Sequence, residues 1–227
     1  MNMPLTVPIP LLREGDRLTR DEFERRYEAM PELKKAELIE GVVYMGSPVS
    51  FVQHGEPHSE LAAWLGVYRA FTPGVRAGDN STVRLDMKNE PQPDVVLFFE
   101  HGGQTDLEDG YITGAPEWAG EVAASSVKLD LGPRFEAYRR NGVREYLVWR
   151  VLEQDIDWFV LRGDQYERLA PVDAGILHSE IFPGLWLDKP ALLSGDLPRV
   201  HEVLQQGLHS AAHGTFVAQM QKRVRQK

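Results

Sequence analysis

The sequence predicts an α/β protein, in the α+β sense, in which a mixed central β-sheet is flanked by helices. Residues 94–99 (DVVLFF) and 117–124 (EWAGEVAA) form short apolar runs of the length expected for strands buried on both faces. Between residues 58 and 71, large apolar side chains recur every three or four positions, which is typical of a helix with one buried face. Strands and helices that alternate in this way bury their apolar surfaces by packing as layers.

The first elements along the chain are expected to be an arm, a helix and a hairpin. Residues 1–18 contain three prolines and are expected to form an extended N-terminal arm. Residues 19–22 (TRDE) have the form of a capping box, so a helix is predicted to begin there and to end before Pro31. Residues 36–47 indicate two short strands joined at Glu40-Gly41.

The middle of the chain is predicted to contribute one helix and the central strands. The helix runs from His58 to about Phe71 and is stopped by Thr72-Pro73-Gly74. A further strand is predicted at 82–86, and 100–110 is expected to be a polar, glycine-rich loop.

The second half of the chain is predicted to complete the sheet and then become helical. A helix is expected at 130–141, capped by Asp130 and closed by Gly142, with Pro133 in its first turn. Three strands are expected at 145–151, 157–161 and 165–169. We expect residues 19–190 to form one domain and residues 191–227 to form a C-terminal helical extension with a basic tail.

Composition limits the possible functions. The 34 acidic and 25 basic side chains give a formal net charge of -9, which argues against a generally basic nucleic-acid coat. The chain has no cysteine, so thiolate chemistry and Cys-ligated metals are excluded, and any metal must be held by oxygen or imidazole ligands. No run is apolar enough for a membrane span, and no signal peptide is evident. We therefore expect a cytoplasmic protein with no membrane partner.

Two predicted strands each carry one carboxylate, Asp94 and Glu121, at a position expected to be buried. A buried carboxylate requires a partner because its desolvation is costly. Two carboxylates on neighbouring strands would suit Mg²⁺, which prefers oxygen ligands and keeps several waters. The alternative is that each acid caps a helix or pairs with an arginine, and the sequence does not show whether the two strands are neighbours.

Four motifs in order, ELIEGVVYMGSP, QPDVVLFF, EVAASS and LDLGPRFEAYRRNGVREYLVWRV, resemble the Uma2 family of restriction-endonuclease-like proteins. The resemblance covers roughly residues 19–190 and extends to the PD-(D/E)XK nuclease superfamily. It implies a restriction-endonuclease-like core and hydrolysis of phosphodiester bonds with Mg²⁺, or Mn²⁺, as cofactor.

Carried over residue by residue, the resemblance implies that Asp94 and Glu121 are the metal ligands and belong to the catalytic set. Glu37, in ELIEG, matches an acidic residue of the family that lines the same site or holds a second cation. An ordinary carboxylate of the hairpin remains the alternative for Glu37.

The motif lysine of the superfamily is missing, since Ala123 stands two residues after the glutamate. Many relatives instead carry a lysine four residues after an aspartate on the next helix, and this chain has Arg134 four residues after Asp130. An arginine cannot accept a proton, but its planar fork can bind a phosphate oxygen. Arg134 is therefore a candidate catalytic residue, with a structural pair to Asp130 as the alternative. Lys128 is a second candidate for the missing lysine, and a solvated loop charge is the simpler explanation for it.

Other polar residues give weaker signals. Arg139, Arg140 and Arg144 lie in a basic stretch that could meet a nucleic-acid backbone, although a solvated helix face is the commoner explanation. The basic tail, Lys222, Arg223, Arg225 and Lys227, is expected to be a disordered end, with weak contact to DNA as the alternative. His54 and His58 do not predict zinc, because Gly55 and Pro57 between them make a shared helical face improbable; His58 corresponds loosely to a family histidine, with His54 as its rival.

The function expected from these observations is that of a Mg²⁺-dependent endonuclease whose nucleic-acid substrate is DNA. The alternative is a nuclease-fold protein that has lost turnover and serves as a nucleic-acid or protein-binding module. A hydrolase of a smaller phosphoester is a third, weaker possibility. A homodimer is expected from exposed strands and the aromatic segment 157–161.

Overall fold

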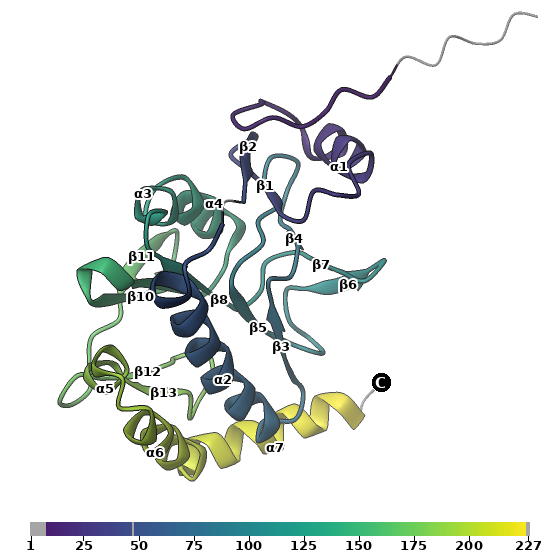
Figure 1. The fold of residues 1–227 in the computed structure, drawn as a ribbon. Coiled ribbons are helices and arrows are strands. Elements are labelled where there is room, and N and C mark those ends of the chain that lie inside the picture. The colour runs from purple at the N-terminus through teal and green to yellow at the C-terminus, as the bar shows by residue number, and fades with distance from the viewer. Residues whose placement is uncertain (1–7, 47, 226–227) are drawn as a thin grey trace, which may run out of the picture.

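A six-stranded mixed sheet forms the centre of the molecule (Figure 1), and the computed structural model describes residues 8–46 and 48–225. The strand order is β11-β10-β9-β8-β5-β3, in which β8 and β9 are parallel and all other neighbours are antiparallel. Strands β5, β8 and the first five residues of β9 are buried, which confirms the interpretation of their apolar runs. The strands are β3 (Val75–Asp79), β5 (Val95–Phe99), β8 (Trp118–Ala123), β9 (Glu145–Arg150), β10 (Asp155–Arg162) and β11 (Gln165–Arg168).

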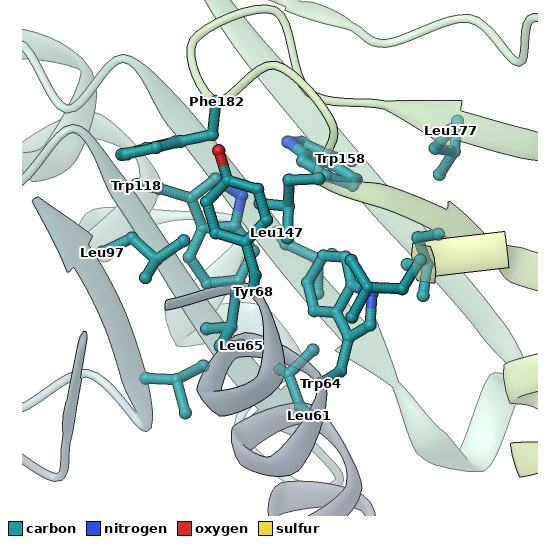
Figure 2. Close-up of a cluster of buried hydrophobic side chains, with 14 of the residues drawn as sticks. Leu61, Trp64, Leu65, Tyr68, Leu97, Trp118, Leu147, Trp158, Leu177 and Phe182 are labelled. Atoms are coloured by element: carbon teal, nitrogen blue, oxygen red, sulfur yellow. The ribbon is translucent and has the colours of Figure 1, made fainter. Parts of the chain in front are cut away.

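Helix α2 (Glu56–Ala70) packs on one face of this sheet with the side chains at the predicted spacing. Figure 2 shows Leu61, Trp64, Leu65 and Tyr68 projecting from one helix into a cluster with Leu97, Trp118 and Leu147. On the other face, α4 (Pro133–Asn141) contributes Tyr138 to a second cluster with Val96, Ala119 and Tyr146. The sheet therefore lies between two apolar layers, as predicted.

The C-terminal segments complete the α2 side of the core. Strands β12 (Ile176–His178) and β13 (Trp186–Asp188) pair with one another, and α5 (Lys189–Ser194), α6 (Leu197–Leu208) and α7 (Ala211–Arg225) follow. Val200, Leu204 and Phe216 from these helices belong to the same apolar cluster as Trp64 of α2. No helix in the described ranges is long and apolar enough to cross a membrane.

The N-terminal part forms a small unit of its own beside the sheet, at the upper end of the view in Figure 1. Helix α1 (Arg20–Glu28) packs on the hairpin of β1 (Ala36–Ile39) and β2 (Val42–Met45) through a cluster that contains Phe23 and Leu38. Glu40 and Gly41 both have positive φ, as a two-residue hairpin turn requires. Leu12, within the expected arm, is already buried in this cluster.

Several predicted elements differ from the structure. The expected loop 100–110 contains β6 (Asp106–Glu108), which pairs with β7 (Tyr111–Thr113), and β7 pairs with the two-residue β4 (Val83–Arg84). These strands are three residues or shorter, too short for a periodic pattern to show. Strand β3 was missed because its sequence, VRAGD, buries only its first residue.

The helix starts were predicted with mixed success. Thr19 is the N-cap of α1, but its side chain makes no capping bond, and Glu22 binds Arg25 and Arg26 rather than completing a capping box. Asp130 does not cap the next helix. It is the last residue of α3 (Val127–Asp130), and α4 begins at Pro133 and ends, as predicted, at Gly142.

The residues expected to support a homodimer are not available on the surface. In β10, Asp157, Trp158, Phe159 and Val160 are buried between β9 and β11. The dimer itself stays a prediction, but this segment does not support it.

Within the basic tail, Lys227 and the side chain of Arg225 lie outside the described residues.

Candidate active site

A cavity of about 280 Å³ opens where the β1–β2 hairpin, the start of α2 and the ends of β5 and β8 meet α4. Its lining includes Lys35, Glu37, His54, Asp94, Glu121 and Arg134. All four residues predicted as catalytic, Glu37, Asp94, Glu121 and Arg134, therefore face one space. They come from four different elements or their ends, and the fold brings them together.

Asp94 and Glu121 lie side by side across two antiparallel strands. The pairing of Val95 with Gly120 in β5 and β8, continued by one residue, places Asp94 opposite Glu121. Directly opposed residues point to the same face of a sheet, with Cβ atoms about 4.5–5.5 Å apart. The backbone N–H of Val122 donates to Asp94 Oδ2 at 2.8 Å, which fixes the aspartate against β8. The adjacency that the sequence could not show is thus present.

Arg134 lies in the first turn of α4 and is buried among three carboxylates. Its Nη1 is 2.6 Å from Asp130 Oδ1 and 3.0 Å from Glu121 Oε2, and its Nη2 is 2.7 Å from Glu37 Oε2. Only 5% of the arginine side chain is exposed, so these contacts are shielded from water. The structural pair with Asp130 is therefore present, and it belongs to a larger cluster that also orients the predicted site residues.

Tyrosine hydroxyl groups and main-chain donors hold the carboxylates from behind. Tyr138 donates to Glu121 Oε1 at 3.0 Å, from the turn of α4 that follows Arg134. The N–H of Gln92 donates to Glu37 Oε1 at 2.7 Å, and Tyr146 donates to the carbonyl of Asp130 at 3.0 Å. Because each partner is itself buried, the carboxylates have little rotational freedom.

The two opposed carboxylates have pKa values shifted in opposite directions. Burial raises the pKa of Glu121 well above its usual range, and the neighbouring charges of Asp94, Asp130 and Glu37 add to this despite Arg134. Burial also acts on Asp94, but hydrogen bonds with His54 and with the N–H of Val122 outweigh it and lower the pKa of Asp94. Asp94 is therefore the stronger acid of the pair.

The residues of the cavity fit a hard divalent cation. Among the described residues, the carboxylates of Glu37, Asp94 and Glu121 line the cavity, and that of Asp130 lies behind it on Arg134; the permanent cations beside them are Arg134 and Lys35. Burial and, to a lesser degree, these neighbouring negative charges raise the pKa of Glu121, and a bound cation would lower it again. Within 8–46 and 48–225, no group of three or more acidic or histidine side chains has the arrangement of a metal site. Two carboxylates suffice for Mg²⁺, which keeps several of its waters.

Sequence reasoning did not point to Lys35 of this cavity, and it named His54 only as the rival of His58. Lys35 Nζ lies 3.9 Å from Asp94 Oδ1, and its side chain is 34% exposed. Its place two residues before Glu37 was the available signal, since residues i and i+2 of an extended chain share a face.

His54 reaches the cavity because the chain is helical earlier than predicted. Residues Phe51–Gly55 form a turn of π-helix that leads directly into α2, where Pro57 lies in the first turn and costs no hydrogen bond. The rings of His54 and His58 are consequently 5.6 Å apart, and the expectation that they do not share a helical face was wrong. His54 Nε2 is 3.3 Å from Asp94 Oδ2, and this contact raises the pKa of His54.

The remaining predicted basic residues lie outside the cavity. Lys128 is exposed on α3 and does not line it. Arg139 binds Glu136 and the carbonyl of Asp164, and Arg140 binds Glu40. Arg144 is exposed. Two of the three arginines expected to meet nucleic acid are thus engaged in ion pairs on the surface.

A mixed sheet between helices, with opposed carboxylates beside a buried basic residue, defines a nuclease-like protein. The family model described as "Uma2: Putative restriction endonuclease" matches residues 20–190. The chain belongs to this family.

A solved structure shows the same fold. It is described as a putative nuclease belonging to DUF820 from Anabaena variabilis, and it matches with a TM-score of 0.52 and 18% identity. The match covers 74% of this chain and 97% of that chain. No curated protein matches the chain.

Proposed function

We propose that this protein is an endonuclease that hydrolyses phosphodiester bonds of DNA with the help of Mg²⁺ or Mn²⁺. The observation that carries the proposal is the opposed pair Asp94 and Glu121 at a cavity with an excess of negative charge. Family membership supports a nuclease, and the oxygen ligands of the pair favour a hard cation.

Asp94 and Glu121 would hold the cation, and the other residues of the cavity would support them. A bound divalent cation would supply Lewis-acid stabilisation of charge on a phosphate, and it would lower the pKa of a bound water. Lys35 is the cation of the cavity with the largest exposed fraction, so we assign it the contact with the phosphate. Arg134 has both terminal nitrogens engaged by carboxylates, and we assign it to positioning Glu37 and Glu121.

The direct test is cleavage of plasmid and linear DNA by the purified protein with Mg²⁺ or Mn²⁺. Asp94→Asn and Glu121→Gln keep the shapes of the side chains but remove charge at the proposed metal site. We expect each variant to lower the cleavage rate at least about a hundredfold, because charge stabilisation in the transition state depends on these groups.

Glu136→Gln is the matched control, since Glu136 is exposed on α4 and contacts only Arg139. It should cleave at the rate of the unmodified protein. Absence of cleavage in the unmodified protein, or cleavage that persists in Asp94→Asn and Glu121→Gln, would falsify the proposal.

One observation favours a second function, that of a nuclease-fold binding module without turnover. The guanidinium of Arg134 already neutralises Glu121 and Glu37, and thus acts as a built-in cation beside one proposed metal ligand. A protein of this kind would bind DNA with an affinity independent of Mg²⁺ and would not cut it. Metal-dependent turnover by the unmodified protein would exclude this second function.

A further inference from the structure

A second cavity, of about 390 Å³, lies beside the candidate active site. Lys34 lines this cavity and Lys35 lines the first one, because consecutive residues of an extended chain point to opposite sides. The walls of the second cavity come from α1, the β4 region and β7. They include Tyr27, Asn80, Arg84, Glu90, Gln92 and Tyr111.

The floor of this cavity has polar atoms that lack a hydrogen-bond partner in the described protein. Glu90 is only 4% exposed, yet its Oε2 is unpartnered, and Glu24 Oε1 and Arg84 Nε also make no hydrogen bond. The last two atoms lie 2.8 Å apart and form an ion pair, so the oxygen of Glu90 is the atom of this group that is left for a ligand. Unpaired buried polar groups are rare and costly, so a ligand with adjacent donors and acceptors would be stabilised here.

The charges at the floor nearly cancel. Glu24 contacts Arg84 at 2.8 Å and Arg20 at 3.6 Å, which offsets its charge. Burial, followed by a side-chain hydrogen bond with Glu24 and its charge, raises the pKa of Glu90 to about 8, so this carboxyl group is mostly protonated at neutral pH and shares its proton with Glu24. A phosphate or a metal ion would find no excess of opposite charge here, whereas an uncharged polar ligand would fit.

An aromatic surface borders the same space. The guanidinium of Arg84 lies over the Tyr111 ring at 4.4 Å from its centroid, and Tyr111 is 44% exposed. Tyr27, on the α1 side, donates its hydroxyl proton to the carbonyl of Lys34 at 3.1 Å, which fixes its ring. A flat ring system with hydrogen-bonding edges matches an aromatic surface above a polar floor.

We propose that this second cavity binds a nucleobase, which stacks on Tyr111 and hydrogen-bonds to Glu90 and its neighbours. If the base is part of a DNA strand whose phosphate lies at Asp94, this inference rests on the proposed nuclease function. Gln92 links the two cavities: its side chain lines the second, and its backbone N–H donates to Glu37 of the first. Lys35 Nζ contacts the carbonyl of Gln92 at 3.3 Å and Asn80 Oδ1 at 3.4 Å on the same wall.

The test is a titration of the ¹⁵N-labelled full chain with adenosine, guanosine, cytidine and thymidine, which lack phosphate. At least one nucleoside should shift the amide signals of Glu90 and Tyr111 at millimolar concentration. Tyr111→Ala should weaken this binding at least about fivefold, as expected for loss of one stacking partner. Phe71→Ala, which removes an aromatic ring that is 57% exposed at the end of α2, should leave it unchanged.

A Glu90→Gln variant provides a second measurement, because an amide retains one donor and one acceptor like the protonated carboxyl group. It should fold and should change the preference among the four nucleosides. Lack of any shift at 10 mM nucleoside, on the order of the weakest useful affinity, would overturn the inference. Equal binding by Tyr111→Ala and the unmodified protein would overturn it as well.

The same titration distinguishes a base within a DNA strand from a free nucleoside or nucleotide. It also distinguishes failure of the base cavity from failure of the proposed nuclease. A short single-stranded oligonucleotide that displaces the nucleoside identifies a strand as the source, and failure to displace it identifies a free nucleoside or nucleotide. Nucleoside binding in a protein that cleaves no DNA would support the base cavity and reject the nuclease. Cleavage without nucleoside binding would reject the base cavity alone.

Discussion

Arg134 is the residue whose role depends most on its surroundings. A lysine at this position would offer one point charge, whereas the guanidinium contacts Asp130, Glu121 and Glu37 in one plane of donors. Burial lowers the pKa of Arg134, but the three carboxylates more than offset this and raise it well above its usual range. Its charge is therefore permanent, and removal of that charge would leave buried carboxylates without compensation.

We expect Arg134→Met to lower the free energy of unfolding by about 3–5 kcal/mol, the usual effect of removing one partner from a buried ion pair. Urea unfolding followed by circular dichroism measures this. Arg139→Met is the control on the same helix, because Arg139 pairs with the exposed Glu136 and such pairs contribute less than about 1 kcal/mol. Equal losses of unfolding free energy in Arg134→Met and Arg139→Met would contradict the central role of Arg134.

Lys35 is expected to affect activity rather than stability. Loss of a charged contact with a phosphate costs about 1.5–3 kcal/mol, so Lys35→Ala should lower kcat/KM for DNA cleavage about ten- to hundredfold. Lys128→Ala, which removes the exposed lysine of α3, should have no effect. A larger loss of kcat/KM in Lys128→Ala than in Lys35→Ala would instead assign the role of the missing motif lysine to Lys128.

Among the elements, β9 carries a buried acid outside the candidate site. Glu145 accepts hydrogen bonds from the N–H groups of Glu180 and Ile181 and from the hydroxyl of Ser179, and so anchors the segment between β12 and β13. Burial raises the pKa of Glu145 to about 7, although these hydrogen bonds act in the opposite direction. The strand thus holds its loop through a carboxyl group that is mostly protonated at mildly acidic pH.

This shift predicts a pH dependence of stability. Since the pKa of Glu145 is higher in the folded state than the ordinary 4.5, its contribution is complete below pH 4.5 and is lost as the pH rises through about 7. Relative to Glu145→Gln, the unmodified protein should lose about 3 kcal/mol of unfolding free energy across this range. Urea titrations of both proteins between pH 4.5 and 8 measure the difference, and a difference that does not change with pH would count against the shift.

At the scale of the whole molecule, the C-terminal helices are part of the same core as the sheet. Leu204 of α6 is fully buried, and α6 packs against both α2 and β13. His213 of α7 lies 3.0 Å from the hydroxyl of Thr72, which follows α2. The extension therefore supports the helix that follows the turn carrying His54 at the candidate site.

We expect Leu204→Ala to lower the free energy of unfolding by about 2–5 kcal/mol, because it leaves a cavity in the shared core. Leu152→Ala, at a position 60% exposed, should change it by less than about 0.5 kcal/mol. A single unfolding transition in both proteins, seen by circular dichroism and by tryptophan fluorescence, would show that sheet and extension unfold together. Two separate transitions would argue for an independent extension.

The strongest patterns predicted most of the fold. The helix face of Leu61, Trp64 and Tyr68 and the buried strands β5 and β8 were evident because their periodicity reflects burial directly. Strands β3, β4, β6 and β7 were missed or misplaced because such short segments bury few side chains. The break at Asp130 was not predicted, although its i,i+4 pair with Arg134 was considered: Asp130 ends the four-residue α3, and α4 begins at Pro133.

The sequence by itself determined the composition of the site: two acids in buried strands, an arginine in place of a lysine, and no cysteine ligands. Only the tertiary structure decided that Asp94 and Glu121 are opposed, that Arg134 is enclosed by three carboxylates, and that Lys35 and His54 face the same cavity. The physical reason is that spacing along the chain controls the face of a helix or strand, whereas strand order and packing control which faces meet. The charge balance of the cavity, and with it the case for a metal, arises from that packing.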